Sequence, residues 1–170
     1  MEMSALNDWL SLAANLGVIA GIVFLAIELR QNNELLRSES RRALLSNDQA
    51  SIIQCLANYD IFAKINQQEK LSQDDQLRLS MIYALDLRNR EFEFFQFKNG
   101  LLDEDTWKSY RDILIWNHST PRGRVWWNKL GRSMVNAEFS VMADKLLQGV
   151  EVSSVNEDLG NWDEEIRHQE

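Results

Sequence analysis

Hydrophobic residues dominate the first part of the chain before a helical periodicity takes over. From Trp9 to Ile27 the sequence runs WLSLAANLGVIAGIVFLAI, nineteen residues without a charged side chain. An α-helix of this length rises about 28 Å, close to the hydrocarbon thickness of a bilayer. The pattern therefore predicts a transmembrane helix over residues 9–29, preceded by a short external N-terminus at residues 1–8.

Charged residues on either side of this segment favour a retained span over a cleaved signal peptide. Glu2 and Asp8 precede it and Glu28-Leu29-Arg30 follow it, whereas a signal peptide has basic residues before its apolar run and a small-residue cleavage site after it. Lys and Arg occur only after the span, so the positive-inside rule predicts an external N-terminus and a cytoplasmic C-terminal region. The arginines that follow closely are Arg30, Arg37, Arg41 and Arg42.

Two faces of the predicted span suit contact with another helix. Ala13, Gly17 and Gly21 recur every four residues, a spacing of small side chains that lets helices approach closely. Ser11 and Asn15 lie about half a turn away, and an amide in hydrocarbon usually finds a partner. Two different contact faces favour head-to-tail association, which closes into rings. We therefore expect a homo-oligomer larger than a dimer, or contact with another membrane protein.

The helical pattern continues beyond the span. Apolar residues recur at helical intervals without Gly or Pro, so one helix is predicted from about Ala5 to Asn58, with residues 30–58 as a helical stalk. Because residues 31–51 are polar on most sides, the stalk either stands in solvent or is covered by partner helices.

Capping signals divide residues 59–149 into a cytoplasmic helical domain. Ser72-Gln-Asp-Asp75 has the spacing of a capping box, Asp103 and Asn136 are N-cap residues, and Gly100 follows a helix end. No strand-like alternation occurs, so the predicted fold is all-α: an N-terminal transmembrane helix continuing into a helical bundle. The helices predicted for the domain cover residues 59–68, 73–99, 104–117, 122–130 and 137–149.

The periodicity of the middle helix also predicts its buried face. The residues of that face are Leu77, Met81, Ala84, Leu85, Arg88, Phe92 and Phe95. Their expected partners are Trp107, Tyr110, Ile113, Leu114, Trp127, Leu130, Phe139, Met142 and Leu146. Four phenylalanines between residues 92 and 97 exceed what one buried face holds, so some of these rings are expected to meet another helix, a subunit or the membrane.

Charge and composition narrow the function classes. A chain of 170 residues is long enough for one domain with its own core. The net charge is -8, and residues 151–170 contribute most of it, with seven acidic residues against Arg167. An acidic protein is a poor partner for nucleic acid. Residues 150–170 are predicted to be an acidic tail, with Trp162 as the tail residue expected to dock.

Residues with catalytic or ligand chemistry are scarce. The two histidines, His118 in a predicted loop and His168 near the end, have no second metal ligand at a recognisable spacing. Cys55 is the single cysteine and is expected to be buried on an apolar helix surface. Neither a phosphate-binding loop nor a dinucleotide fingerprint is present. We therefore predict no enzymatic activity, no cofactor and no metal site.

Two groups of charged residues invite a more specific interpretation. Arg88 and Glu91 are three residues apart, on or beside the apolar face of the middle helix. This spacing predicts an internal ion pair or a network with Arg90, and the alternative is a ligand-binding arginine. Residues 121–132 combine cations and tryptophans without an acid. They suit an anionic leaflet or a small anion, or else hold one buried Trp and four solvated cations. This patch consists of Arg122, Arg124, Trp126, Trp127, Lys129 and Arg132.

Three stretches of the sequence form a recognisable set: Phe24-Leu-Ala-Ile-Glu-Leu-Arg-Gln-Asn32, Leu87-Arg-Asn-Arg-Glu-Phe92 leading to Gly100-Leu-Leu-Asp103, and Val125-Trp-Trp127. Together they resemble a widespread family of uncharacterised bacterial small membrane proteins. The likeness covers roughly residues 10–148. It implies the same layout, a single span in the bacterial inner membrane with a cytoplasmic helical domain, and no particular activity.

These patterns predict a membrane-anchored interaction or scaffold protein whose partners are the lipid bilayer and other protein chains. An oligomeric membrane effector or pore is an alternative, motivated by Ser11, Asn15 and the glycine row. The other alternative is a soluble helical bundle whose own domain covers the apolar helix.

Overall fold

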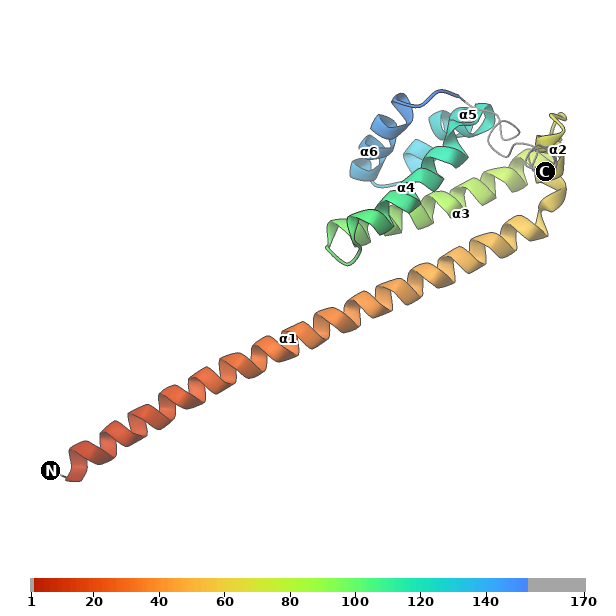
Figure 1. Ribbon diagram of the computed structural model, residues 1–170. Helices are drawn as coiled ribbons and strands as arrows, with labels where there is room; N and C mark the ends of the chain where they lie inside the picture. The colour runs from red at the N-terminus through yellow and green to blue at the C-terminus, as the bar shows by residue number, and fades with distance from the viewer. Residues whose placement is uncertain (1, 153–170) are drawn as a thin grey trace, which may run out of the picture. The chain divides into compact units, whose positions relative to one another are not determined.

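The computed structural model describes residues 2–152, and every regular element in that range is helical (Figure 1). This confirms the predicted all-α class, with a long apolar N-terminal helix followed by a helical bundle. The predicted tail residues Trp162 and His168 lie outside the described residues. The elements are α1 (Glu2–Ala57), α2 (Tyr59–Asn66), α3 (Gln73–Lys98), α4 (Glu104–Ser119), α5 (Pro121–Lys129), the 3-10 helix η1 (Gly131–Met134) and α6 (Ala137–Gln148).

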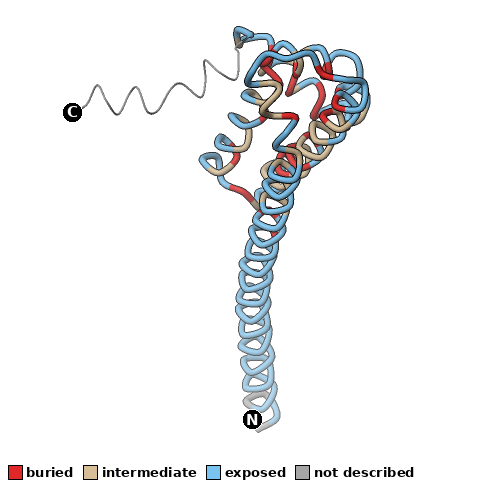
Figure 2. The backbone as a smooth tube through the Cα atoms, turned by 90° about the vertical axis from the view of Figure 1, so that its right-hand side faces the viewer, coloured by how far each residue is buried: buried red, intermediate tan, exposed pale blue. Residues whose placement is uncertain are grey.

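The chain divides into two compact units, residues 1–41 and residues 42–170. The first unit is the N-terminal part of α1, an uninterrupted helix as predicted. Among the described residues, α1 is the one helix long and apolar enough to cross a membrane, and its most apolar stretch is entirely uncovered (Figure 2). Ile22, for example, is 62% exposed. The alternative in which the chain's own domain covers this helix stays a prediction.

Local hydrogen bonds explain where the helices of the second unit begin. At α3, the Asp75 backbone N–H donates to Ser72 Oγ and the Ser72 N–H donates to Asp75 Oδ2, both at 3.1 Å, which completes the predicted capping box. Asp103 and Asn136 cap α4 and α6, as predicted. Thr120 caps α5 with Pro121 in the first turn. The helix starts are therefore determined locally.

An aromatic core holds α3, α4, α5 and α6 together. The Phe94 ring lies 5.7 Å from Trp107 and 5.6 Å from Phe139, measured between centroids. Phe97 stacks on Trp107 and Phe95 packs edge-on against Phe94. The domain itself thus accommodates most of the phenylalanine surplus that was expected to need an outside partner. Of the predicted core, Trp107, Leu114, Trp127 and Phe139 are buried.

The buried face of α3 differs from the predicted one. Leu77 and Met81 are 57% and 60% exposed. The buried residues of α3 are Asp75, Leu79, Leu87, Asn89, Arg90, Glu93 and Phe94. Four of these seven side chains are polar or charged, so hydrophobic periodicity points to the neighbouring stripe of α3 instead. Two further predicted core residues, Ile113 and Leu130, are also exposed.

Candidate functional site

The most unusual feature of the second unit is a buried arginine on α3. The Arg90 side chain is 2% exposed and lies 3.1 Å from Glu93, between Nη2 and Oε1. Its Nε lies 3.5 Å from Asp86 Oδ1, one turn earlier on the same helix. Its Nη2 also lies 3.5 Å from Asp48 Oδ1 on α1. One cation is therefore shared by three carboxyl groups, which we call the Arg90 cluster.

Helix α4 completes this cluster from the other side. The Tyr110 hydroxyl donates to Asp48 Oδ2 at 3.1 Å, and the Arg90 guanidinium lies 4.9 Å from the centroid of the same tyrosine ring. The Asn117 amide donates to Asp86 Oδ2 at 2.9 Å. Three helices thus meet through polar side chains. Removing a partner would leave Arg90 or a carboxylate of the cluster buried without full compensation of its charge, which is destabilising.

Burial changes the protonation of the cluster. It raises the pKa of Glu93 to about 9; Arg90 opposes the shift and Asp48 and Asp86 add to it. Burial also raises the pKa of Asp86. Burial and the neighbouring carboxylates thus outweigh the opposing effect of the Arg90 charge on Glu93. Within the described residues, no three His, Cys, Asp or Glu side chains gather closely enough to hold a metal ion. The arrangement suits the joining of helices.

The same helices meet through further polar contacts along their length. Asn89 donates to Ser51 Oγ at 2.8 Å, and Arg78 donates to Asn58 Oδ1 at 2.9 Å. Higher positions on α1 pair with lower positions on α3, so the two helices run antiparallel here. Leu44 is the main apolar anchor of this segment, at 3% exposure. The second unit consequently begins at residue 42, whereas the sequence predicts a stalk up to residue 58.

Cys55 lies in this antiparallel segment and is half-buried. Burial, with the nearby Asp86 carboxylate, raises the pKa of its thiol. A thiol with a raised pKa reacts slowly, so Cys55 is a poor nucleophile.

The predicted pair of Arg88 and Glu91 lies at the surface of α3. Arg88 Nη1 donates to Glu91 Oε2 at 2.7 Å, and the Arg88 side chain is 61% exposed. The expectation of an internal position is wrong for Arg88, because the arginine that turns inward is Arg90. The spacing of Asp86, Arg90 and Glu93 around the buried Leu87 is the sequence signal that could have identified it.

The structure contradicts the aromatic half of the predicted membrane-surface patch. Trp126 and Trp127 are 7% and 2% exposed. Their indole N–H groups donate to Ser80 Oγ at 2.7 Å and to Asp144 Oδ1 at 2.8 Å. Neither ring can reach a headgroup layer without unfolding the core. Of the basic half, Lys129 and Arg132 are exposed, whereas Arg122 and Arg124 are half-buried.

His118 is a core residue of α4 and not a loop residue as predicted. It is fully buried, with ring centroids 5.6 Å from Tyr83, 5.7 Å from Trp126 and 6.1 Å from Trp127. Burial lowers its pKa to about 4. A neutral imidazole enclosed by aromatic rings fits a packing role, since a substrate has no access to it.

An open apolar groove lies between α1 and α3 within the second unit. It contains the row that was predicted to be core, and on the opposite flank of α1 a second row of apolar side chains is exposed. The groove is lined by Gln54, Asn58, Leu77, Arg78, Met81, Ile82 and Leu85. The second row consists of Leu45, Ile52 and Leu56 on α1, followed by Tyr59 at the start of α2. Such surfaces are typical of sites that bind another helix.

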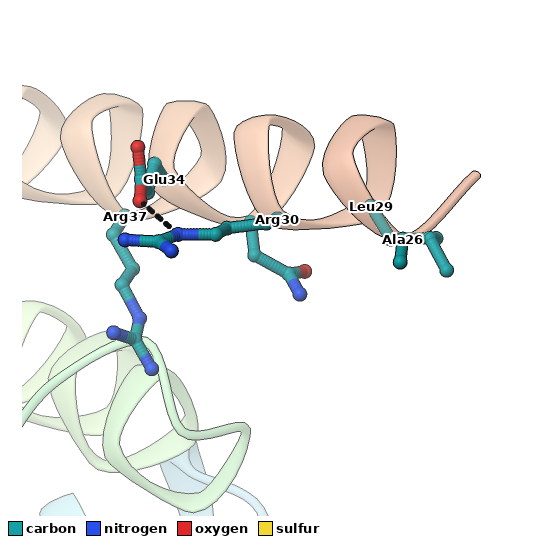
Figure 3. Close-up of a pocket in the computed structure, with 6 residues that line it drawn as sticks. Ala26, Leu29, Arg30, Glu34 and Arg37 are labelled. Atoms are coloured by element: carbon teal, nitrogen blue, oxygen red, sulfur yellow. Dashed lines mark hydrogen bonds and ion pairs between the residues drawn. The ribbon is translucent and has the colours of Figure 1, made fainter. Parts of the chain in front are cut away.

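The first unit carries one further surface feature, shown in Figure 3. A hollow on α1 is lined by Ala26, Leu29, Arg30, Asn33, Glu34 and Arg37. All six belong to one helix, so the hollow is open to the surroundings. Arg30 Nε donates to Glu34 Oε1 at 3.1 Å. The hollow marks the boundary at which the apolar stretch ends and charged residues begin.

The residues predicted to form an oligomer interface are all exposed on α1. Around Gly17 and Gly21, an added Cβ would meet nothing within 4 Å. Ala13, Ser11 and Asn15 are exposed on the same helix. Association of these faces stays a prediction.

Comparison with family models, with characterised proteins and with solved structures found no match. The resemblance to small bacterial single-span proteins therefore stays a prediction.

Proposed function

We propose that the protein is a membrane-anchored interaction protein, in which residues 9–29 span a bilayer and the second unit binds another protein. The observation that carries this proposal is the exposure of the apolar stretch of α1. Leu16, Ile19 and Phe24 are 58%, 58% and 59% exposed. A soluble chain rarely exposes so continuous an apolar surface, whereas in lipid this surface is favourable.

The boundary on α1 supports the proposed orientation. Arg30 and Arg37 lie on the hollow of Figure 3, immediately after the apolar stretch. Long basic side chains at a membrane surface extend their charges toward anionic headgroups, and a cluster of arginines favours the cytoplasmic side. The proposed location is accordingly the bacterial inner membrane, with the second unit in the cytoplasm.

Interaction suits the second unit better than catalysis. The charged residues of the Arg90 cluster are occupied in joining α1, α3 and α4. The groove containing Leu77 and Met81 is open and apolar, which fits a helix of a partner protein.

Fractionation of cells that express the full chain tests the anchor. We expect the protein in the membrane fraction, resistant to alkaline carbonate and released by detergent, with an intact mass equal to that of residues 1–170. Recovery in the carbonate supernatant contradicts the span. A mass that lacks the apolar stretch identifies a cleaved signal sequence and likewise contradicts it.

An oligomeric membrane effector is a second candidate. The open row of Ala13, Gly17 and Gly21 would let two helix backbones approach closely. Crosslinking in native membranes should then give species larger than a dimer, and Gly17→Leu with Gly21→Leu should reduce them. Recovery of monomer alone contradicts this candidate.

A further inference from the structure

Helix α5 carries positive charge on half-buried and exposed side chains, and the described carboxylates do not neutralise all of it. Arg122 donates to the Glu69 backbone carbonyl and Arg124 to the Val150 backbone carbonyl, each at 2.7 Å. In the described part of the chain, neither arginine forms an ion pair with a carboxylate, and Lys129 is exposed without one. Arg132, in contrast, pairs with Asp144 at 2.8 Å. The α5 face therefore has cations that lack an anionic partner.

An apolar side chain lies between two of these cations. Val125 is 54% exposed and follows Arg122 by three residues. Lys129 follows Val125 by four residues, so all three share one helical face. We call Arg122, Val125 and Lys129 the α5 face. Its pattern is cation, apolar side chain, cation.

The end of the described chain lies beside this helix. Arg124 holds the Val150 carbonyl, so the residues that follow leave the domain next to α5. Residues 153–170 could reach about 27 Å as a helix. The nine residues of α5 rise only about 14 Å, so the tail is long enough to cover them.

The sequence of the tail complements the α5 face. Val155, Leu159, Trp162 and Ile166 recur at intervals of four, three and four residues. On a helix these positions share an arc of about 60°. Between residues 153 and 170, six acidic residues stand against Arg167, and they fall on both sides of that arc. The pattern is acid, apolar side chain, acid.

We propose that residues 155–166 bind the α5 face of their own chain, with Trp162 and its apolar neighbours against Val125 and the flanking acids against Arg122 and Lys129. Charge complementarity and the position at which the tail leaves the domain carry this assignment. Opposite charges attract, and burial of the tail's apolar row adds to the attraction. The proposal does not depend on the membrane anchor.

Zero-length carbodiimide crosslinking of the full chain in detergent tests it. Lys129 should crosslink to Asp158, Asp163 or Glu165, as identified by mass spectrometry of peptides. Lys108, an exposed lysine on α4, is the internal control and should give no such product. Mixing chains of two isotopic compositions distinguishes crosslinks within a chain from those between chains.

Trp162→Ala removes the apolar contact and leaves every carboxylate in place. It should lower the yield at Lys129 about tenfold, since burying a large side chain contributes at least about 1.4 kcal/mol. Three results overturn the proposal: a Lys129 yield no higher than that of Lys108, crosslinks that join two isotopic chains, or a yield that Trp162→Ala leaves unchanged.

Discussion

Soluble proteins usually bury apolar side chains and expose charged ones. The apolar stretch of α1 departs from this pattern on the outside, and the α3–α4 pair of the second unit departs from it on the inside. Along α1, residues 9–27 place large apolar side chains outside and carry no charge. In the second unit, Arg90 and Glu93 are among the most buried side chains. One region needs an apolar environment around it, and the other needs paired charges within it.

The difference shows what each region depends on. A helix that is apolar all round is stabilised by an apolar environment, such as lipid or the helices of another protein chain. The charged interior of the second unit gains stability only when every charge is paired. Charges placed in the apolar stretch should therefore affect only the anchoring of α1, and loss of a buried partner should affect only the stability of the second unit.

Charges within the apolar stretch should abolish membrane association. Ile19→Lys with Ile22→Lys should cost about 6–8 kcal/mol of insertion free energy, which exceeds the total of roughly 3–6 kcal/mol expected for the segment. Carbonate extraction measures the loss. Leu35→Lys with Leu36→Lys, beyond the stretch, is the matched control and should stay in the membrane. If the variant with lysines at positions 19 and 22 remains resistant to carbonate, the stretch does not lie in lipid.

Truncating a phenylalanine should affect stability in one region only. Phe139 is fully buried, so Phe139→Ala should lower the free energy of unfolding of the second unit by about 3–5 kcal/mol. Phe24 is 59% exposed on α1, and Phe24→Ala should change that free energy by less than about 0.5 kcal/mol. Denaturant titration in detergent, followed by tryptophan fluorescence, compares them. Equal losses would mean that α1 folds as part of the core.

Removing the buried cation should destabilise the Arg90 cluster. Arg90→Met leaves Asp48, Asp86 and Glu93 without their guanidinium and should cost about 3–5 kcal/mol. The pair Arg90→Met with Glu93→Met removes a buried charge and a buried carboxyl together and should recover part of this loss.

The rate at which a thiol reagent modifies Cys55 reports whether the Arg90 cluster holds α1 on α3. Arg90→Met removes an attachment between α1 and α3, so a thiol reagent should modify Cys55 faster than in the unmodified chain. An unchanged rate would show that the polar contacts do not hold this segment of α1 on α3.

Close to neutral pH, the pH dependence should be the smallest effect. His118 has its pKa lowered to about 4 by burial, from 6.5 in the unfolded chain. The unfolded chain therefore binds a proton first, and stability falls as pH drops from 6.5 toward 4, by up to about 1.4 kcal/mol per pH unit. His118→Gln should flatten this part of the profile in unfolding measurements. An unchanged profile would assign the acid sensitivity to other groups.

Local signals made much of the fold predictable. The capping box at Ser72 and the caps at Asp103 and Asn136 depend on residues within one turn, so sequence spacing identifies them. The long continuous α1 followed from its apolar stretch and the lack of Gly and Pro after it. These features require no knowledge of what packs against them.

The candidate site could be predicted only in part. The spacing of Asp86, Arg90 and Glu93 along α3 is visible in the sequence, but their partners on α1 and α4 join them only through tertiary packing. Arg90 turns inward since Asp48 and Tyr110, from two other helices, supply its partners. Arg88 turns outward although it lies beside the apolar row containing Leu85. Hydrophobic periodicity cannot distinguish a buried polar face from an exposed one, and a neutral buried histidine such as His118 resembles a loop residue in sequence.

The location of the apolar stretch in a bilayer is tested most directly by labelling intact cells. In a Cys55→Ser chain, Met3→Cys and Leu45→Cys place single thiols at exposed positions on either side of the stretch. A membrane-impermeant maleimide added from outside should modify position 3 and should reach position 45 only after lysis. Modification of both positions only after lysis would contradict a membrane-spanning α1.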